Sequence, residues 1–353
     1  MKERIIGLDI LRIASMFGIV MLHVLGQGGV LRSYTSESSF YINNFLEIFF
    51  MCSVNVFALL SGFLSIEKKK SLYRAIELPV ITFFYCVIIT LLFVILFRNK
   101  LDGFYDIVKG LFPPLAGRYW YITCFFPILL LEPIINKCLN SLSIKSYRTI
   151  VITLLILFSF IPSILNTDFF IIENGYSFVW LLTCYIIGGY IRKTDFNIKK
   201  RVSIPLIITI PIILLFGNML IDYKFGGHHD YMVSYTSPLI LSSALACLLL
   251  FKNIKINKDS IIIRTLSTIS FDVYIIHCHV LIFDIFLKDA FSFVSGFNII
   301  IQPLISILIG ITIYASCSII GWIRMIVFEK LMINKLIRRI SDNITVFDIN
   351  DCE

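Results

Sequence analysis

Long apolar segments recur along this chain, and they constrain its fold more than any other feature. Each is about 20 residues long, the length that crosses the hydrocarbon core of a bilayer as an α-helix. Only 15% of the residues are charged, whereas a typical soluble domain is roughly 25% charged. We therefore predict an all-α polytopic transmembrane helix bundle of about ten spans. The predicted spans are 6–26, 43–66, 75–97, 119–139, 149–166, 176–192, 203–221, 236–252, 267–287 and 298–322.

The basic residues predict the orientation of this bundle. Most of the 31 lysine and arginine residues fall in alternate loops, starting with the N-terminal one. Cytoplasmic loops carry such an excess, so we predict that both termini are cytoplasmic. The transmembrane domain is assigned to 1–325 and a short cytoplasmic tail to 326–353. The segment 101–116 is too short to span and is expected to lie along the interface or re-enter.

Charge and cysteine usage exclude several classes of function. The net charge of +8 resides in short loops between apolar segments, which favours membrane orientation over a nucleic-acid partner. Nine cysteines are scattered, mostly within apolar segments and without C-x-x-C pairs. We interpret them as apolar core residues and expect no disulfide framework and no metal site. The first span is not a cleavable signal peptide, since Asp9 and Arg12 interrupt it and no A-x-A site follows.

The first span carries three ionisable side chains, Asp9, Arg12 and His23. Such residues are costly inside a bilayer and usually face a functional interior. Arg12 and His23 are eleven residues apart, which places them on one helix face about 16 Å apart along the axis. Asp9 is close enough to pair with Arg12. Arg12 is also compatible with snorkelling to the headgroups, and His23 with a simple interhelical hydrogen bond.

Further polar residues fall within or beside other spans. In the ninth span, Tyr274 and His277 share a helical stripe with Ser270, Leu281 and Asp284, and His279 points the opposite way. For each candidate we weigh a structural alternative: helix packing for Ser61 and Gly62, and an aromatic belt for Trp120 and Tyr121. The remaining candidates are Asn55, Glu132 and the outer-loop pair His228 and His229.

Familiar soluble catalytic motifs are absent. The sequence has no G-x-S-x-G elbow, no H-E-x-x-H, no Walker A loop and no dinucleotide fingerprint. The candidate chemistry therefore resides in the spans.

Four segments together resemble one family. "RIIGLDILRIASMFGIVMLHV" resembles the first span of the membrane acyltransferase 3 family, whose signature is an arginine, ten residues and a histidine, here Arg12 and His23. "NVFALLSGFL", "RYWYI" and "SFDVYIIHCHV" follow in the expected order. The resemblance is closest to stand-alone surface-polysaccharide O-acetyltransferases of the bacterial plasma membrane. It implies transfer of an acyl group, most often acetyl, from acyl-CoA to a hydroxyl of a surface or lipid-linked glycan. It also implies acetyl-CoA as a substrate, without a permanently bound cofactor.

The residues fit such a reaction. A neutral histidine is a suitable base near pH 7, and an arginine fork suits the CoA phosphates. We expect His23 to deprotonate the acceptor or to carry the acyl group transiently. The predicted catalytic residues are His23, Arg12 and His277. The predicted donor-binding residues are Arg12, Asp9, Lys69, Arg74 and Ser61. The predicted acceptor-binding residues are Asn55, Trp120, Tyr121, Glu132 and Tyr274.

Two other functions are compatible with charged spans. One is a transporter or polymerase of lipid-linked glycans. The other is a non-catalytic sensor or anchor. Assembly into a homo-oligomer is compatible with every one of these functions.

Overall fold

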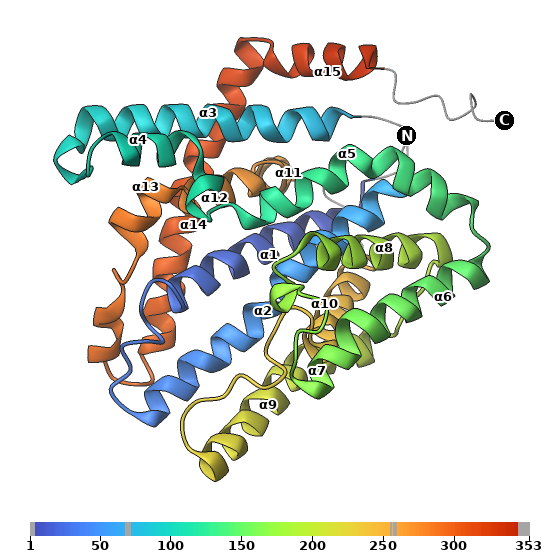
Figure 1. Cartoon of the computed structure of the whole chain (residues 1–353), viewed down its shortest axis with the longest axis vertical. Coiled ribbons are helices and arrows are strands. Elements are labelled where there is room, and N and C mark those ends of the chain that lie inside the picture. Colours follow the sequence, from blue (N-terminus) through green and yellow to red (C-terminus); the bar gives the residue numbers. More distant parts are fainter. Residues whose placement is uncertain (1–3, 68–71, 255, 257–259, 345–353) are drawn as a thin grey trace.

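A computed structural model describes residues 4–67, 72–254, 256 and 260–344. Over this part of the chain the regular structure is entirely helical (Figure 1). The principal helices are α1 (Ile6–Leu25), α2 (Glu37–Ser65), α3 (Tyr73–Leu96), α4 (Phe104–Leu111), α5 (Trp120–Ser141), α6 (Ile144–Leu155), α7 (Ile161–Leu165), α8 (Phe178–Thr194), α9 (Lys200–Phe225), α10 (Pro238–Phe251), α11 (Ile261–Thr268), α12 (Ser270–His277), α13 (Val280–Ile282), α14 (Gln302–Lys330) and α15 (Ile333–Asn343).

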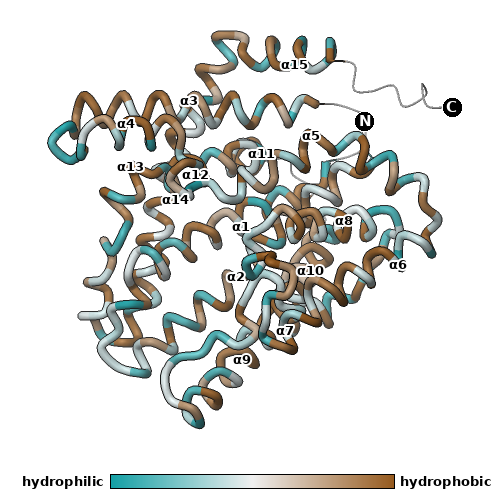
Figure 2. Tube along the Cα trace, in the orientation of Figure 1, coloured by the Kyte–Doolittle hydropathy of each residue, from teal (hydrophilic) through white to brown (hydrophobic). Residues whose placement is uncertain are grey.

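The predicted membrane bundle is confirmed, with fewer candidate spans than expected. Among the described residues, seven helices are long and apolar enough to cross a bilayer, or eight if one bent pair counts as a span. The sequence predicted about ten, because it counted every apolar segment. Two of those segments form α8, with 17 residues, and α10, with 14. A 14-residue helix rises only about 21 Å, less than the hydrocarbon thickness of about 30 Å. Hydrophobic residues dominate the long helices (Figure 2).

Helices α1 and α2 run side by side through the middle of the bundle (Figure 1). The first contacts α10, α11, α12 and α14, and the second contacts α8, α9 and α10. This position explains why both helices are largely buried, whereas α9 is mostly exposed to the surroundings. Polar residues on α1 therefore face protein and not lipid.

Small residues allow α2 and α8 to pack closely. A Cβ atom added at Gly62 would overlap the carbonyl oxygen of Tyr185, and one added at Gly188 would overlap that of Leu59. Small residues at helix contacts are a general device in membrane proteins, because association there depends on close packing. The structural alternative for the Ser61–Gly62 segment, helix packing, is thus confirmed for Gly62.

The ninth predicted span is not one regular helix. The chain bends by 60° between α12 and the segment that starts at Val280. His279 adopts extended backbone angles at the break, and a π-helical turn, Phe283–Leu287, follows α13. The predicted stripe from Ser270 to Asp284 is therefore wrong beyond His277, since the break redirects everything after it.

The C-terminal helices extend beyond the predicted domain boundary. Helix α14 continues through residue 325 to Lys330, and α15 then packs against α3 (Figure 1). Residues 326–330 are therefore part of a helix that also contributes to the membrane bundle.

Candidate active site

Three neighbouring cavities follow α1 from Arg12 to His23. The Arg12 cavity, of about 620 Å3, is lined by Arg12, Ser61, Arg74 and Tyr121 among others. The Arg118 cavity, of about 460 Å3, is lined by His23, Arg118, Trp120 and Tyr274 among others. Between them lies the central cavity, which shares lining residues with both. The two ends of one helix face thus reach two separate spaces.

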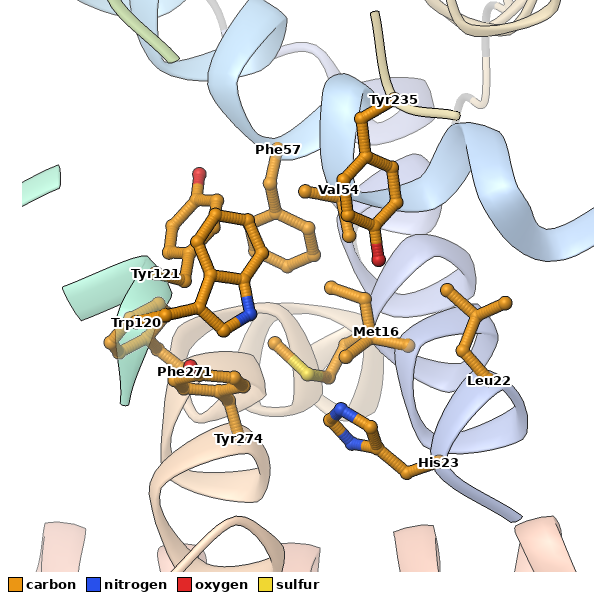
Figure 3. Close-up of a pocket in the computed structure, with 11 residues that line it drawn as sticks. Met16, Leu22, His23, Val54, Phe57, Trp120, Tyr121, Tyr235, Phe271 and Tyr274 are labelled. Atoms are coloured by element: carbon orange, nitrogen blue, oxygen red, sulfur yellow. The ribbon is translucent and has the colours of Figure 1, made fainter. Parts of the chain in front are cut away.

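The central cavity is a narrow passage. Its volume is about 20 Å3, enough for roughly one water molecule. Phe57, Tyr121 and Phe271 also line the Arg12 cavity, whereas His23, Trp120, Leu22, Tyr235 and Tyr274 also line the Arg118 cavity. Figure 3 shows the rings of Trp120, Tyr235 and His23 around this space, with the indole nitrogen and the tyrosine oxygen directed into it. The walls are mainly aromatic and apolar, and the space is too small for more than about one water molecule.

Arg12 is held by a hydrogen-bonded chain. Its Nη1 atom donates to Ser267 Oγ over 3.1 Å, and Ser267 Oγ donates to Asp9 Oδ1 over 2.7 Å. Asp9 forms its closest ion pair with Arg4, at 2.6 Å, whereas Arg12 lies 3.9 Å from it. The predicted Asp9–Arg12 pair therefore exists, but Ser267 of α11 makes the shorter contact. The guanidinium of Arg12 lines its cavity, and it has further N–H donors besides the one that contacts Ser267.

Two further features shape the Arg12 cavity. Arg74 donates to Ser65 Oγ over 2.7 Å, which fixes a second guanidinium at the wall. Buried Arg324 forms a bidentate pair with Asp272, with both bonds at 2.8 Å, and Tyr85 donates to the same carboxylate over 2.6 Å. Asp272 satisfies Arg324, so Arg12 and Arg74 are the cavity's better candidates for an anionic ligand.

His23 and His277 form a direct pair between α1 and α12. His23 Nδ1 lies 2.8 Å from His277 Nε2. His277 Nδ1 lies 2.5 Å from the carbonyl oxygen of Val273, which can only accept, so this nitrogen carries a hydrogen. In a neutral His277, Nε2 is then an acceptor, and His23 Nδ1–H donates to it. The proton on Nδ1 leaves His23 Nε2 with a free lone pair.

The Arg118 cavity has a mixed polar and aromatic wall. Arg118 pairs with Asp284 at 2.8 Å, and its guanidinium lies 3.9 Å from the ring centre of Phe283. Glu47 and Glu173 add carboxylates, and Tyr176 adds a ring 4.6 Å from that of Trp120. Aromatic faces with interspersed hydrogen-bonding groups suit a hydroxyl-rich ligand.

A fourth cavity continues from the Arg118 cavity. It measures about 450 Å3 and shares Met51, Tyr176 and Tyr235 with it. Its wall also includes Asp230, which lies in the loop before α10. Burial, together with the nearby carboxylate of Asp222, raises the pKa of Asp230. The two cavities together form a space larger than one small molecule requires.

Several predicted site residues lie elsewhere. Asn55 is fully buried and satisfied, because it donates to the carbonyl oxygen of Tyr235 and accepts from Trp180 Nε1. Glu132 is buried in α5 and lines none of these four cavities. Lys69 lies outside the described residues. Asn55 therefore supports the fold, since its amide connects α2, α8 and the segment before α10.

The outer-loop histidines, His228 and His229, contact residues outside the candidate site. His229 Nδ1 lies 2.8 Å from the carboxylate of Asp222, and the ring of His228 stacks on Phe40 with 3.8 Å between centres. They line none of the four cavities. Neither histidine is therefore part of the walls of the candidate site.

Sequence reasoning missed some of the lining residues. Tyr176 is the first residue of the predicted span 176–192, and Tyr235 directly precedes the predicted span 236–252. The structure places both in loops, before α8 and α10. Ser267 and Phe271 lie in the ninth predicted span, but their role depends on how α11 and α12 pack against α1. Glu47 lies within a predicted span, and an acidic residue there was a usable signal.

Comparison with known proteins adds a direct finding. The model of the acyltransferase 3 family, described as an acyltransferase domain, matches residues 5–322. The match therefore includes Arg12, His23, His277 and every cavity-lining residue up to α14. No curated protein and no solved structure matches the chain.

Proposed function

The chain belongs to the acyltransferase 3 family of membrane acyltransferases, and from this premise we propose that it transfers an acetyl group from acetyl-CoA to a hydroxyl of a cell-surface or lipid-linked glycan. The proposed location is the bacterial plasma membrane. Family membership favours an enzyme over the transporter and sensor considered above. One observation carries the proposal: His23, with a free Nε2 atom, lies at the junction between two cavities.

The Arg12 cavity is the proposed donor site. Acyl-CoA combines anionic phosphates with a long, thin pantetheine arm. Arg12 and Arg74 supply guanidinium forks for the phosphates, because charge-assisted bidentate contacts are strong. The arm would then extend through the central cavity toward His23, a distance of about 16 Å along α1. The central cavity holds about one water molecule, so side chains of its wall must move to admit the thin arm, and they would have to move further for a sugar. We propose that the Arg12 cavity faces the cytoplasm.

The Arg118 cavity is the proposed acceptor site. The rings of Trp120, Tyr176 and Tyr235 offer surfaces for sugar rings, and Glu47 and Glu173 offer acceptors for hydroxyl hydrogens. The fourth cavity continues from the Arg118 cavity past Tyr176 and Tyr235, so the combined space has room for more than one sugar unit. A glycan or lipid-linked glycan therefore fits the space better than an isolated small alcohol.

The proposed chemistry is direct acyl transfer. His23 Nε2 removes the proton from the acceptor hydroxyl, and the oxygen attacks the thioester carbonyl that has arrived through the central cavity. The oxyanion then collapses, the carbon–sulfur bond breaks, and the sulfur of CoA takes the proton from His23. Trp120 Nε1–H and the Tyr235 hydroxyl, both directed into this space (Figure 3), are suitable donors for the oxyanion. His277 would keep the proton of His23 on Nδ1.

The proposal is tested with purified protein in proteoliposomes. Acetyl-CoA and surface glycans from the deletion strain are supplied, and base-labile acetyl esters on the glycan are measured. We expect ester formation that depends on the protein and on the acetyl donor. Two results together would exclude a glycan as the acceptor. The protein would acetylate no glycan fraction from the deletion strain, and glycans of the wild-type strain would be equally free of base-labile esters.

A further inference from the structure

Three potential metal ligands converge where α12 ends. His23 Nδ1 lies 2.8 Å from His277 Nε2, and Cys278 Sγ lies 3.5 Å from the first and 3.4 Å from the second. Each residue offers one ligand atom, and the three atoms lie within 4.8 Å of one another. We propose that this tripod is a Zn2+ site that controls the activity of His23.

The distances fit zinc. With zinc bonds of about 2.1 Å to nitrogen and about 2.3 Å to sulfur, tetrahedral ligands lie roughly 3.4 Å (nitrogen to nitrogen) and roughly 3.6 Å (nitrogen to sulfur) apart. Both nitrogen–sulfur distances are already close to that value. The two imidazole nitrogens, now 2.8 Å apart, must separate by about 0.6 Å. Two imidazoles and a thiolate are also the donor types that favour zinc over magnesium or calcium.

His277 has the surroundings of a metal ligand. Its Nδ1–H donates to the carbonyl oxygen of Val273 one turn earlier, which fixes the ring and leaves Nε2 directed at the tripod. Metal-bound histidines almost always donate their other ring N–H to such a partner. Cys278 is held at the break between α12 and α13, next in sequence to His277.

The tripod leaves a fourth position open. His23 and Cys278 both line the Arg118 cavity, which provides an entry path and space for water. The charged groups of the same wall are the carboxylates of Glu47 and Glu173 and the guanidinium of Arg118, which is paired with Asp284. Three protein ligands with one open position are typical of accessible zinc sites.

Zinc binding and base catalysis exclude each other here. The ion needs the lone pair of His23 Nδ1, so the remaining proton must reside on Nε2. The base proposed above needs the opposite arrangement, with the lone pair on Nε2. Zinc therefore inhibits acyl transfer, and binding releases the proton of the Cys278 thiol. The inhibition of acyl transfer by zinc rests on the proposed function, whereas metal binding itself does not. The site departs from the expectation that the cysteines are only apolar core residues.

The test uses the full-length protein in detergent, after treatment with a chelator. Zn2+ binding is measured by competition with a chromophoric chelator, and Co2+ is used as a spectroscopic substitute. We expect one Zn2+ per chain at this site and a near-ultraviolet thiolate-to-cobalt band. In Cys278→Ser, which preserves the size of the side chain, the band disappears and zinc affinity falls at least tenfold. Thermal unfolding checks that this variant is folded.

Matched controls separate this site from other possible ligands. Cys317→Ser removes another buried cysteine, Cys52→Ser removes one near Cys247, and the double variant His228→Ala/His229→Ala removes the outer-loop histidines. All three should retain the wild-type affinity and cobalt band. The proposal is overturned if Cys278→Ser binds zinc as tightly as wild type, or if a control variant abolishes the band.

Activity provides the second readout. Each variant is assayed in chelator, as its own reference, and then over a Zn2+ titration. Wild type should be inhibited and should recover on chelation, whereas Cys278→Ser should need at least tenfold more Zn2+. Zinc binding without inhibition would overturn the control of His23 while the metal site stands. Absence of acyl transfer even in chelator would count against the proposed function and leave the metal site to be decided by the cobalt band.

Discussion

The Nδ1 atom of His23 on α1 lies 2.8 Å from the Nε2 atom of His277 on α12, across a separation of 254 residues. The contact fixes the ring of His23 at the wall between the central and Arg118 cavities. It also assigns the proton of His23 to Nδ1, because His277 is already committed to Val273.

His23→Ala should abolish acyl transfer while the protein still inserts and folds. The variant removes the base, and general acid–base groups contribute about 10²–10⁴-fold to rate. The measurement is kcat in proteoliposomes, with thermal unfolding as a check of folding. His228→Ala is the matched control, since it removes a histidine outside the cavities. A kcat of the His23→Ala variant within threefold of the wild-type value would exclude His23 as the base.

His277 should act as a positioning residue. In His277→Gln the amide oxygen can still accept a hydrogen bond from His23 Nδ1–H, whereas His277→Leu offers no acceptor. We expect His277→Leu to lower kcat at least about tenfold with little change in the KM for acyl-CoA, and His277→Gln to recover part of that loss. Equal activity of both variants, with equal unfolding temperatures, would show that only the volume of the side chain matters.

Arg12→Lys should weaken the use of acyl-CoA. Lysine retains the charge but loses the fork that can contact both Ser267 and a phosphate. A hydrogen bond to a charged group contributes about 1.5–3 kcal/mol, so we expect KM for acyl-CoA to rise by about tenfold or more. Arg192→Lys is the control, because Arg192 pairs with Glu67 and lines none of the four cavities. An unchanged acyl-CoA titration would leave Arg12 as a snorkelling residue.

Gly62→Ala should destabilise the bundle. The added Cβ would overlap the carbonyl oxygen of Tyr185 on α8, and overpacking typically costs about 1–3 kcal/mol. Gly217→Ala, in α9, is the matched control, since nothing lies within 4 Å of the added atom. Alanine there should be neutral or stabilising, because it favours helix more than glycine does. The readout is thermal unfolding in detergent, and equal shifts for both variants would refute the close contact.

Reporter fusions test the orientation on which the donor side depends. Fusions after Arg201 and Arg339 should report a cytoplasmic position, and one near His228 an external position, because of the bias of basic loops. This outcome requires α8 and α10 to connect the two sides of the membrane although they are short. The proposed donor cavity then faces cytoplasmic acyl-CoA. A cytoplasmic signal near His228 together with an external one at Arg201 would show that α8 does not cross. An external signal from a fusion after Lys70 would reverse α1 and remove Arg12 from donor binding.

The sequence alone determined the membrane character of the chain and the relation between Arg12 and His23. Apolar segments of about 20 residues are stable in lipid as α-helices, because a helix satisfies its own backbone hydrogen bonds there. Two residues eleven positions apart in such a helix lie on one face whatever surrounds it. These are local rules, and the structure agrees with them: α1 is continuous from Ile6 to Leu25 and reaches one cavity with Arg12 and another with His23.

Only the tertiary structure decided what that face meets. Periodicity treated the ninth span as one helix, but the chain breaks after His277, so Asp284 pairs with Arg118 and Cys278 joins the two histidines. Asn55 and Glu132 have the polarity of site residues, yet their positions in the packed bundle keep them from the cavity walls. Tyr235 has no sequence signal and lines the central cavity. Contacts between residues more than 150 positions apart depend on how helices pack, and no local pattern of side chains records that geometry.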